Sequence, residues 1–334
     1  MKKSLRRVVG FGDFLLRLMP PGYRRFGQTS SFNCYYTGAE SNVCASLAVM
    51  GVPAAFVTRV PDNPIARTGL GELKRLDVDV SDVVFGGDRL GLYYLEKGAS
   101  QRPSLVVYDR MHSGLTTARR RDFKWTSVLK GAGYFHVTGI TPALGGELPA
   151  IVEDACRTAR RLGVQVVCDL NYRSRLWTVA EAAATMPRIV RLADHLIANA
   201  WDAREILGVE TDDDPARAAE RMKKDYPRLK TVAMTFRTAA SASDNMLSAL
   251  LHADGKAYRS REYAIHVVDR VGGGDSFAAG LIYGLVHALK PQEMVEFATA
   301  ASCLKHSIEL DVNLSTVPEI LRLMNGGEGG QVQR

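Results

Sequence analysis

From about residue 128 onward, segments with the pattern of buried strands alternate with segments long enough to form helices. Strands joined by helices of this length form right-handed βαβ units, whose strands lie parallel in one sheet. The pattern predicts strands at 134–139, 164–169, 195–199, 231–235 and 246–252, with helices at about 145–162 and 179–192. A parallel sheet binds its ligands at the carboxyl ends of its strands. The polar residues just past these ends are therefore candidates for a site: Asp169, Asn171, Arg173, Asn199, Asp202 and Arg237.

The stretch from Asp269 to Gly280 brings three consecutive glycines, Gly272 to Gly274, to the start of a helix of small residues, and Asp275 follows them. The free N–H groups and the positive dipole end of a helix favour an anion, and glycine lets a phosphate approach without meeting a Cβ. A carboxylate facing that phosphate is unfavourable unless it has a task, such as accepting a proton from an attacking hydroxyl. The other interpretation is a glycine turn with an Asp that only caps the helix, and this segment alone supports both equally.

The pattern Asp269-x-x-Gly272-x-Gly274-Asp275 resembles the C-terminal signature of the ribokinase-like, or PfkB, carbohydrate kinases. The resemblance implies an α/β, ribokinase-like three-layer fold with a mainly parallel central sheet and a small β-sheet lid. It implies one such domain over residues 1–334, and the glycine-rich tail at 326–334 is expected to be disordered. It also implies that the amides of Gly272, Gly273 and Gly274 form an anion hole and that Asp275 is the catalytic base.

The residues Gly38-Ala39-Glu40-Ser41-Asn42, which lead into a small-residue helix ending at Gly51, resemble the family's N-terminal signature. By this resemblance Gly38 and Asn42 hold hydroxyl groups of the sugar. Without it, Asn42 as a simple helix cap is equally well supported. Thr37 and Pro61 stand where relatives carry glycine, which a loop accommodates.

Two stretches, at about 14–37 and 88–114, have the alternation of short strands lying outside the parallel core. They resemble the family's lid, through which many members associate, so a homo-oligomer is expected. Within the lid, Gly91-Leu92-Tyr93-Tyr94 and Val107-Tyr108-Asp109-Arg110 resemble one branch, the 2-keto-3-deoxygluconate kinases. That branch implies contacts from Tyr93, Tyr108 and Arg110 to a sugar acid. Taken alone, each would be interpreted as a surface residue of a strand.

The segment Asp169-Leu170-Asn171-Tyr172-Arg173 resembles the same branch, which implies that Asn171 and Arg173 lie near the phosphate and the substrate. Asn199-Ala200-Trp201-Asp202 stands in the place of the family's Asn-x-x-Glu motif, which helps to organise magnesium and phosphate. Because Asp202 is shorter than Glu, a water-mediated role is expected rather than direct contact with the metal, and no metal ligand is assigned.

Arg237 lies in the segment 235–243, where many relatives have a glycine-rich loop beside the nucleotide, but this segment contains no glycine. Asp311 stands where family members hold an acid that contacts the substrate. Asp269 is a candidate ligand for a monovalent cation such as K⁺, although Arg270 and Val271 replace the usual threonines.

The expected activity is therefore ATP-dependent and Mg²⁺-dependent phosphorylation of 2-keto-3-deoxygluconate on its terminal hydroxyl. Phosphoryl transfer requires positioning and charge stabilisation, which the glycine amides and the metal supply, together with a base. Two alternatives remain open: a kinase for a neutral sugar such as fructose, ribose or a nucleoside, and a silent ligand-binding relative. Walker and protein-kinase motifs are absent, and Gly10-x-Gly12 does not continue into a dinucleotide-binding pattern.

The chain carries a net charge of +7, but its basic clusters, such as Arg119 to Arg121, lack interleaved aromatic residues. We therefore expect an anionic small-molecule substrate and no nucleic-acid partner. Five cysteines without a CxxC pair indicate reduced thiols. The sequence shows neither a signal peptide nor a membrane span, which predicts a cytoplasmic protein.

Overall fold

The computed structural model describes residues 5–210 and 214–327 of the chain. Among these residues, ten strands form one sheet in the order β15–β14–β13–β12–β11–β10–β1–β4–β6, with β16 paired to β14. Strands β6 to β13 of this order are parallel, and the β14 edge is antiparallel. Their bounds are β1 (Arg7–Phe11), β4 (Ala54–Val57), β6 (Val78–Asp79), β10 (Ala132–Thr138), β11 (Gln165–Asp169), β12 (His195–Ile197), β13 (Thr231–Ala239), β14 (Asp244–Ala253), β15 (Lys256–Arg259) and β16 (Tyr263–His266).

The central strands are almost wholly apolar because both faces of the sheet are covered. Successive side chains of a strand point to opposite faces, so Val9 and Val166 belong to one hydrophobic core and their neighbours Val8 and Val167 to the other. Continuous apolar runs are typical of parallel strands buried on both sides. The sheet is thus the middle layer of three.

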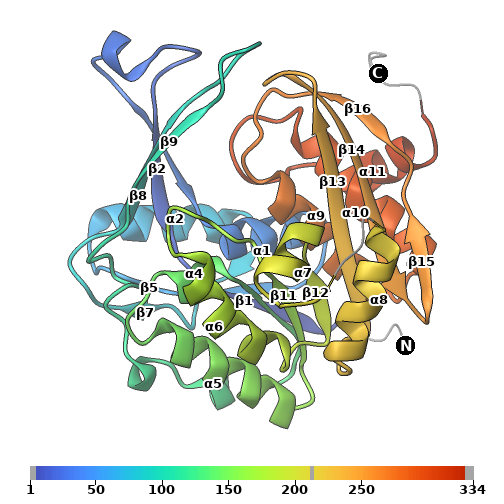
Figure 1. Ribbon diagram of the computed structural model, residues 1–334. Coiled ribbons are helices and arrows are strands. Elements are labelled where there is room, and N and C mark those ends of the chain that lie inside the picture. Colours follow the sequence, from blue (N-terminus) through green and yellow to red (C-terminus); the bar gives the residue numbers. More distant parts are fainter. Residues whose placement is uncertain (1–4, 211–213, 328–334) are drawn as a thin grey trace.

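Helices make the two outer layers (Figure 1). The first core packs α3 (Trp125–Val128), α5 (Leu148–Arg161), α6 (Val179–Val190), α7 (Ala200–Glu205) and α8 (Pro215–Asp225) on one face. The second packs α1 (Ala39–Val49), α2 (Pro64–Arg75), α9 (Gly273–Val286), α10 (Pro291–Lys305) and α11 (Val317–Met324) on the other. The short α4 (Ile140–Ala143) follows β10. This arrangement confirms the α/β three-layer fold with a mainly parallel sheet.

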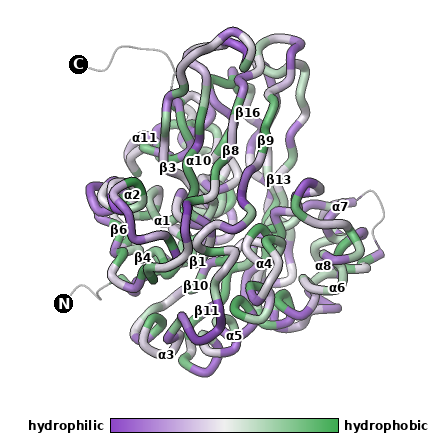
Figure 2. Tube along the Cα trace, turned by 90° about the vertical axis from the view of Figure 1, so that its left-hand side faces the viewer, coloured by the Kyte–Doolittle hydropathy of each residue, from purple (hydrophilic) through white to green (hydrophobic). Residues whose placement is uncertain are grey.

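A separate four-stranded sheet has the order β3–β2–β8–β9 and is called the lid here. Its strands are β2 (Leu15–Met19), β3 (Asn33–Thr37), β8 (Gly91–Glu96) and β9 (Leu105–Asp109), which lie within the two stretches expected to form it. Its inner face packs Leu15, Met19, Tyr93 and Leu95 together. Two further short strands, β5 (Arg59–Val60) and β7 (Val84–Phe85), pair with each other in a separate sheet. Figures 1 and 2 show the lid strands and the β13–β14 hairpin at one end of the molecule, with α3 and α5 toward the other.

One detail differs from the sequence-based expectations. Strand β13 extends to Ala239 and forms a hairpin with β14, so the segment expected as a loop at 235–243 is mostly strand. Helix α10 begins at Pro291, a residue that is favoured in the first turn of a helix. The tail expected to be disordered lies, from residue 328, outside the described residues. None of the described helices has the length and apolar character needed to cross a membrane.

Candidate active site

A cavity of about 460 Å³ lies at the carboxyl ends of β1, β10, β11 and β12, beneath the inner face of the lid. The start of α9 closes it from the other side of the sheet. The structure brings to its wall fifteen of the sixteen residues expected to contact substrate, phosphate or nucleotide: Gly38, Asn42, Tyr93, Tyr108, Arg110, Asp169, Asn171, Arg173, Asn199, Asp202, Gly272, Gly273, Gly274, Asp275 and Asp311. Arg237 is the exception. Arg237 lies on the exposed part of the β13–β14 hairpin. Partial burial of its guanidinium, and the positive charges of Arg270 and Arg173, lower its pKa.

The glycine run forms the N-terminus of α9, but Asp275 is not its cap. Gly272 is the N-cap residue, with the left-handed φ of 83° that glycine adopts most readily, and α9 begins at Gly273. A Cβ on Gly272 would overlap the carbonyl oxygen of Asp311, and one on Gly273 would meet the ring of His306. Asp275 is therefore in the first turn, where the positive end of the helix dipole stabilises its carboxylate. The backbone N–H groups of this turn face the cavity and can bind an anion.

The Asp275 carboxylate is tied to the N-terminal signature. Its Oδ2 accepts a hydrogen bond of 2.7 Å from Nδ2 of Asn42 on α1. Burial raises the pKa of Asp275 to about 6, with a further increase from Asp311, while the Asn42 bond opposes the shift. A carboxylate with a pKa near neutrality, held beside an anion-binding helix end, has the properties of a general base. Asn42 lies within α1 rather than at its start, so the cap interpretation of Asn42 is wrong.

The carboxylates of Asp169 and Asp202, near the strand ends, and of Asp275, at the start of α9, lie close together. Burial, then repulsion from Asp275 and Asp202, raises the pKa of Asp169 to about 8, while Arg173 opposes it. Burial also raises the pKa of Asp202 to about 6, again opposed by Arg173. Carboxylates that repel one another and carry raised pKa values are stabilised by an added cation. The position is suited to a divalent ion that arrives with a polyphosphate.

The residues around these carboxylates are locally constrained. Asn199 caps α7: its Oδ1 accepts from the backbone N–H of Asp202 at 2.9 Å, and Asp202 Oδ2 accepts from the N–H of Asn199 at 3.1 Å. These two reciprocal hydrogen bonds occupy Oδ2 of Asp202, so its Oδ1 remains available to a ligand in the cavity. Asn171 has a φ of 39°, in the left-handed region that Asn tolerates, and its N–H donates to Asp169 at 3.1 Å. No group of three His, Cys, Asp or Glu side chains in the described parts of the chain is arranged to hold a metal by itself.

Asp311 is held by the lid from above. Its Oδ2 accepts from the hydroxyls of Tyr93, at 2.6 Å, and Thr37, and its Oδ1 accepts from Arg17. The hydroxyl of Tyr93 is thus engaged within the protein, and burial with the nearby Asp311 raises its pKa well above the usual value. Sequence analysis missed Arg17, which is fully buried and also bonds Asp269 at 2.7 Å. Two signals pointed to Arg17, its inward position in an alternating strand and its place in the segment 16–22, which resembles the same kinase branch, but neither identified its partners.

Arg110 faces the cavity with unsatisfied hydrogen-bonding capacity. Its guanidinium lies 4.4 Å from the ring centre of Tyr108 and 3.8 Å from the carboxylate of Asp13. Arg110 Nε and Asp13 Oδ2 are both buried without a hydrogen-bond partner in the described parts of the chain. Burial raises the pKa of Asp13 to about 6, although Arg110 opposes the shift. Buried polar atoms without partners are rare in native proteins, so a polar ligand is expected to bond these two. Sequence analysis missed Asp13, although it lies just past the carboxyl end of β1, much as Asp169 lies at the carboxyl end of β11.

Glu40 is a second buried acid in the wall of the cavity that sequence analysis did not single out. Its Oε1 accepts from the backbone and hydroxyl of Thr138 and from the hydroxyl of Thr141, which ties α1 to the end of β10. A Cβ on Gly12 would overlap its carboxylate, so the glycine after β1 makes room for it. Burial raises the pKa of Glu40 to about 7.

Comparisons with known proteins agree with this geometry. Residues 6–308 match the model of the family described as pfkB family carbohydrate kinase. The crystal structure of 2-dehydro-3-deoxygluconokinase from Thermotoga maritima is similar, with a TM-score of 0.94 and 47% identity over 97% of this chain and 99% of that one. Among curated proteins, the 2-dehydro-3-deoxygalactonokinase of Haloferax volcanii is 30% identical over 97% of this chain and 98% of its own. The 2-dehydro-3-deoxygluconokinase of Bacillus subtilis is 27% identical over 89% of each.

Proposed function

This chain belongs to the pfkB family of carbohydrate kinases, and we propose that it phosphorylates a sugar acid, 2-keto-3-deoxygluconate, on its terminal hydroxyl with ATP. The observation that carries the substrate assignment is Arg110, a largely buried cation at the lid whose Nε has no hydrogen-bond partner among the described residues. Asp13 lies 3.8 Å from this guanidinium but forms no hydrogen bond with it, so a substrate carboxylate would supply an acceptor that a neutral sugar lacks. The relatives named for 2-dehydro-3-deoxygluconate and 2-dehydro-3-deoxygalactonate, which are sugar acids, support the same substrate class.

In the proposed complex the two ends of the substrate are held by different parts of the protein. The carboxylate lies beside Arg110, with a hydrogen bond from the hydroxyl of Tyr108, since that of Tyr93 is donated to Asp311. The terminal hydroxyl then lies beside Asp275. Asp275 accepts its proton as the oxygen attacks the γ-phosphorus, and Asn42 keeps the carboxylate oriented.

The phosphates lie over the start of α9. The N–H groups of Gly273 and Gly274 donate to the transferred phosphoryl group, where charge develops in the transition state. Arg173 offsets the negative charge shared by the phosphates and the neighbouring carboxylates. Asp169, Asn199 and Asp202 provide the oxygen atoms that would hold Mg²⁺, directly or through water, as it arrives with ATP. The metal would neutralise charge on the β- and γ-phosphates.

No monovalent cation is included in this proposal, because two side-chain cations fill the region next to Asp269. Arg17 bonds its carboxylate, and Nζ of Lys305 bonds the carbonyl oxygens of Asp269, at 3.4 Å, and Ile308, at 3.1 Å. Lys305 is fully buried. Burial lowers its pKa, while the carboxylates of Asp269 and Asp311 favour its charged form. An ammonium on backbone carbonyls occupies the kind of position that K⁺ would take.

We also propose that copies of the chain associate through the outer face of the lid. Leu105 and Val107 on the edge strand β9 are 45% and 47% exposed, and Phe32, before β3, is 40% exposed. An exposed apolar edge strand is a ready surface for pairing. Sedimentation of the wild type and of Val107→Asp measures this, and a wild type that sediments as a monomer contradicts it.

Arg110→Met tests the substrate assignment. Losing a charge-assisted bond to a carboxylate costs roughly 1.5–3 kcal/mol, so kcat/KM for 2-keto-3-deoxygluconate should fall about 10- to 150-fold. The KM for ATP should scarcely change. Arg25→Met is the matched control, since Arg25 is an arginine of the lid region whose side chain is 63% exposed.

Steady-state rates on 2-keto-3-deoxygluconate, its C4 epimer, fructose and ribose complete the test. A wild type that prefers fructose or ribose, or an Arg110→Met variant with unchanged kcat/KM, contradicts the sugar-acid assignment. The two epimers are included because the named relatives differ in this respect.

A further inference from the structure

A second cavity, of about 960 Å³, lies at the opposite end of the molecule from the active site. Its walls come from segments that each precede a strand: α3 before β10, the last turns of α5 before β11, Leu192 before β12 and Arg228 before β13. The amino ends of parallel strands lie at the edge opposite their carboxyl ends. Figures 1 and 2 place α3 and α5 away from the lid. We call this cavity the basic groove.

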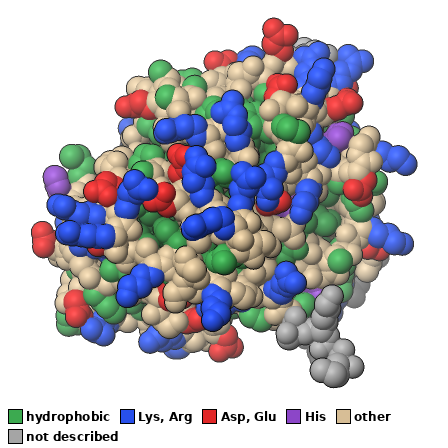
Figure 3. Space-filling view, turned by 90° about the horizontal axis from the view of Figure 1, so that it is seen from below, with side chains coloured by type: hydrophobic (Ala, Val, Ile, Leu, Met, Phe, Trp, Pro, Cys, Tyr) green, Lys and Arg blue, Asp and Glu red, His purple; other side chains and the backbone are tan. Residues whose placement is uncertain are grey.

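The groove has a surplus of positive charge. Six of its lining residues are cations: Arg120, Lys124, Arg157, Arg160, Arg161 and Arg228. Three are paired with carboxylates, namely Arg120 with Asp154, Arg157 with Glu153 and Arg228 with Asp194. Lys124, Arg160 and Arg161 have no acidic partner among the described residues. Figure 3, seen from below, shows Lys and Arg side chains gathered on this end of the molecule.

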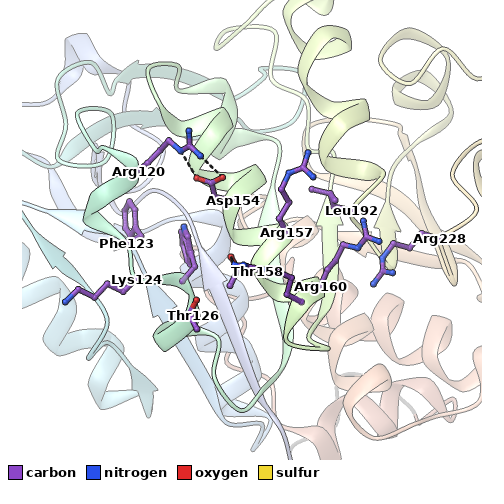
Figure 4. Close-up of a pocket in the computed structure, with 12 residues that line it drawn as sticks. Arg120, Phe123, Lys124, Thr126, Asp154, Arg157, Thr158, Arg160, Leu192 and Arg228 are labelled. Atoms are coloured by element: carbon purple, nitrogen blue, oxygen red, sulfur yellow. Dashed lines mark hydrogen bonds and ion pairs between the residues drawn. The ribbon is translucent and has the colours of Figure 1, made fainter.

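The unpaired cations are spread along the groove rather than placed together. In Figure 4, Lys124 lies at one end with Arg120, and Arg160 lies toward the other with Arg228. The position of Arg160 and Arg161 in the last turn of α5 compensates the negative end of that helix dipole. That explanation does not extend to Lys124, which precedes α3, nor to Arg228. Residues from separate elements therefore bring positive charge to one concave surface.

An independent observation points to a ligand with acceptor oxygens. Trp125 lines the groove and is only 6% exposed, yet its Nε1–H has no hydrogen-bond partner within residues 5–210 and 214–327. Arg228 Nε is likewise buried and has no partner in these ranges. Buried donors are nearly always satisfied in native proteins, because leaving one without an acceptor is unfavourable. An oxygen of a bound anion would supply the missing acceptor.

We propose that the basic groove binds a small anion carrying two or more phosphate groups. Two ends with unpaired cations match two anionic groups, and Arg forks suit phosphate oxygens. The volume is in the range of small-molecule sites. The aromatic residues Phe123 and Trp125 are buried, so they offer no exposed faces for stacking bases, which disfavours a nucleic-acid strand. Because the groove lies at the amino ends of the strands, its ligand does not compete with substrate for space.

Titration calorimetry with inorganic pyrophosphate, at about 50 mM and about 200 mM salt, tests the proposal on the full chain. Arg160→Ala and Lys124→Ala each remove an exposed cation without an acidic partner, so the fold should be retained. Each should weaken pyrophosphate binding about 10-fold, and higher salt should weaken binding to the wild type. Trp125→Phe should weaken it less, since it removes one neutral donor. Arg75→Ala, which changes an exposed arginine on α2, is the matched control and should bind as the wild type does.

The active site can also bind phosphate, so Arg173→Ala serves as the reciprocal variant. Pyrophosphate binding that Arg160→Ala weakens and that Arg173→Ala leaves unchanged belongs to the groove and supports the proposal. Binding that only Arg173→Ala removes, or no saturable binding at low salt, overturns it. A mixed-sequence DNA duplex is the second probe: duplex binding that depends on Arg160 while pyrophosphate does not bind also overturns the small-anion assignment.

Discussion

Replacing Arg17 by Met should destabilise the fold strongly, because the side chain is the cation of a buried charge network. Arg17 is fully buried and bonds Asp269 at 2.7 Å through Nη2 and Asp311 through Nη1. Burial opposes its charge, but Asp311, Tyr93 and Asp269 together hold its pKa above the usual value. Met keeps an unbranched apolar stem but is shorter than Arg and carries no charge, so two buried carboxylates lose their main partner.

Removing one partner of a buried ion pair costs about 3–5 kcal/mol. Two features limit the loss in this case. Asp269 still accepts from the backbone N–H groups of Val271 and Leu310, and Asp311 still accepts from Tyr93. Lys305 also remains next to Asp269. We therefore expect a decrease of about 3 kcal/mol in the free energy of unfolding, at the low end of that range.

Urea denaturation followed by circular dichroism measures this decrease, provided that the m-value is unchanged. Arg67→Met is the control: Arg67 and Asp62 form an exposed pair, each 58% exposed, and its loss should change the free energy of unfolding far less than Arg17→Met does. The double variant Arg17→Met with Asp311→Asn should recover part of the stability, since it removes one uncompensated charge. A natively folded Arg17→Met protein that loses less than about 1 kcal/mol refutes the reasoning.

Three further predictions concern catalysis. Asp275→Asn should lower kcat by about 10²–10⁴ with little change in nucleotide affinity, measured by a coupled assay and by ATP-analogue titration; near wild-type turnover would make Asp275 structural only. Because burial raises the pKa of Asp275 to about 6 and a base must be ionised, kcat/KM should be constant above that pH and fall about 10-fold per unit below it. A profile that rises on acidification contradicts this sign. Replacing K⁺ by tetramethylammonium should change kcat less than about 2-fold, because Arg17 and Lys305 supply the fixed charge; a strong K⁺ requirement would show that a cation site exists elsewhere.

Much of the fold and of the site follows from local sequence patterns. Apolar runs of strand length separated by helices predict the parallel sheet, because the strands are buried on both faces. Polar residues after those strands, such as Asn171 and Asn199, lie at the cavity because the carboxyl ends of parallel strands share one edge. The glycine run before Asp275 is also a local signal, since only glycine fits the left-handed turn against Asp311.

Other features depend on contacts between distant parts of the chain. Arg17 lies 252 residues from Asp269 and 294 from Asp311, so no local pattern identifies it as their partner. Arg237 follows the core of its strand as the other candidates do, but the β13–β14 hairpin carries it past the cavity into solvent. The basic groove likewise joins residues from separate helices and loops. Local periodicity determines which face of each element is buried, whereas the pairing of charges depends on how the elements pack, because electrostatic and hydrogen-bond contacts act over a few ångströms in space and not along the sequence.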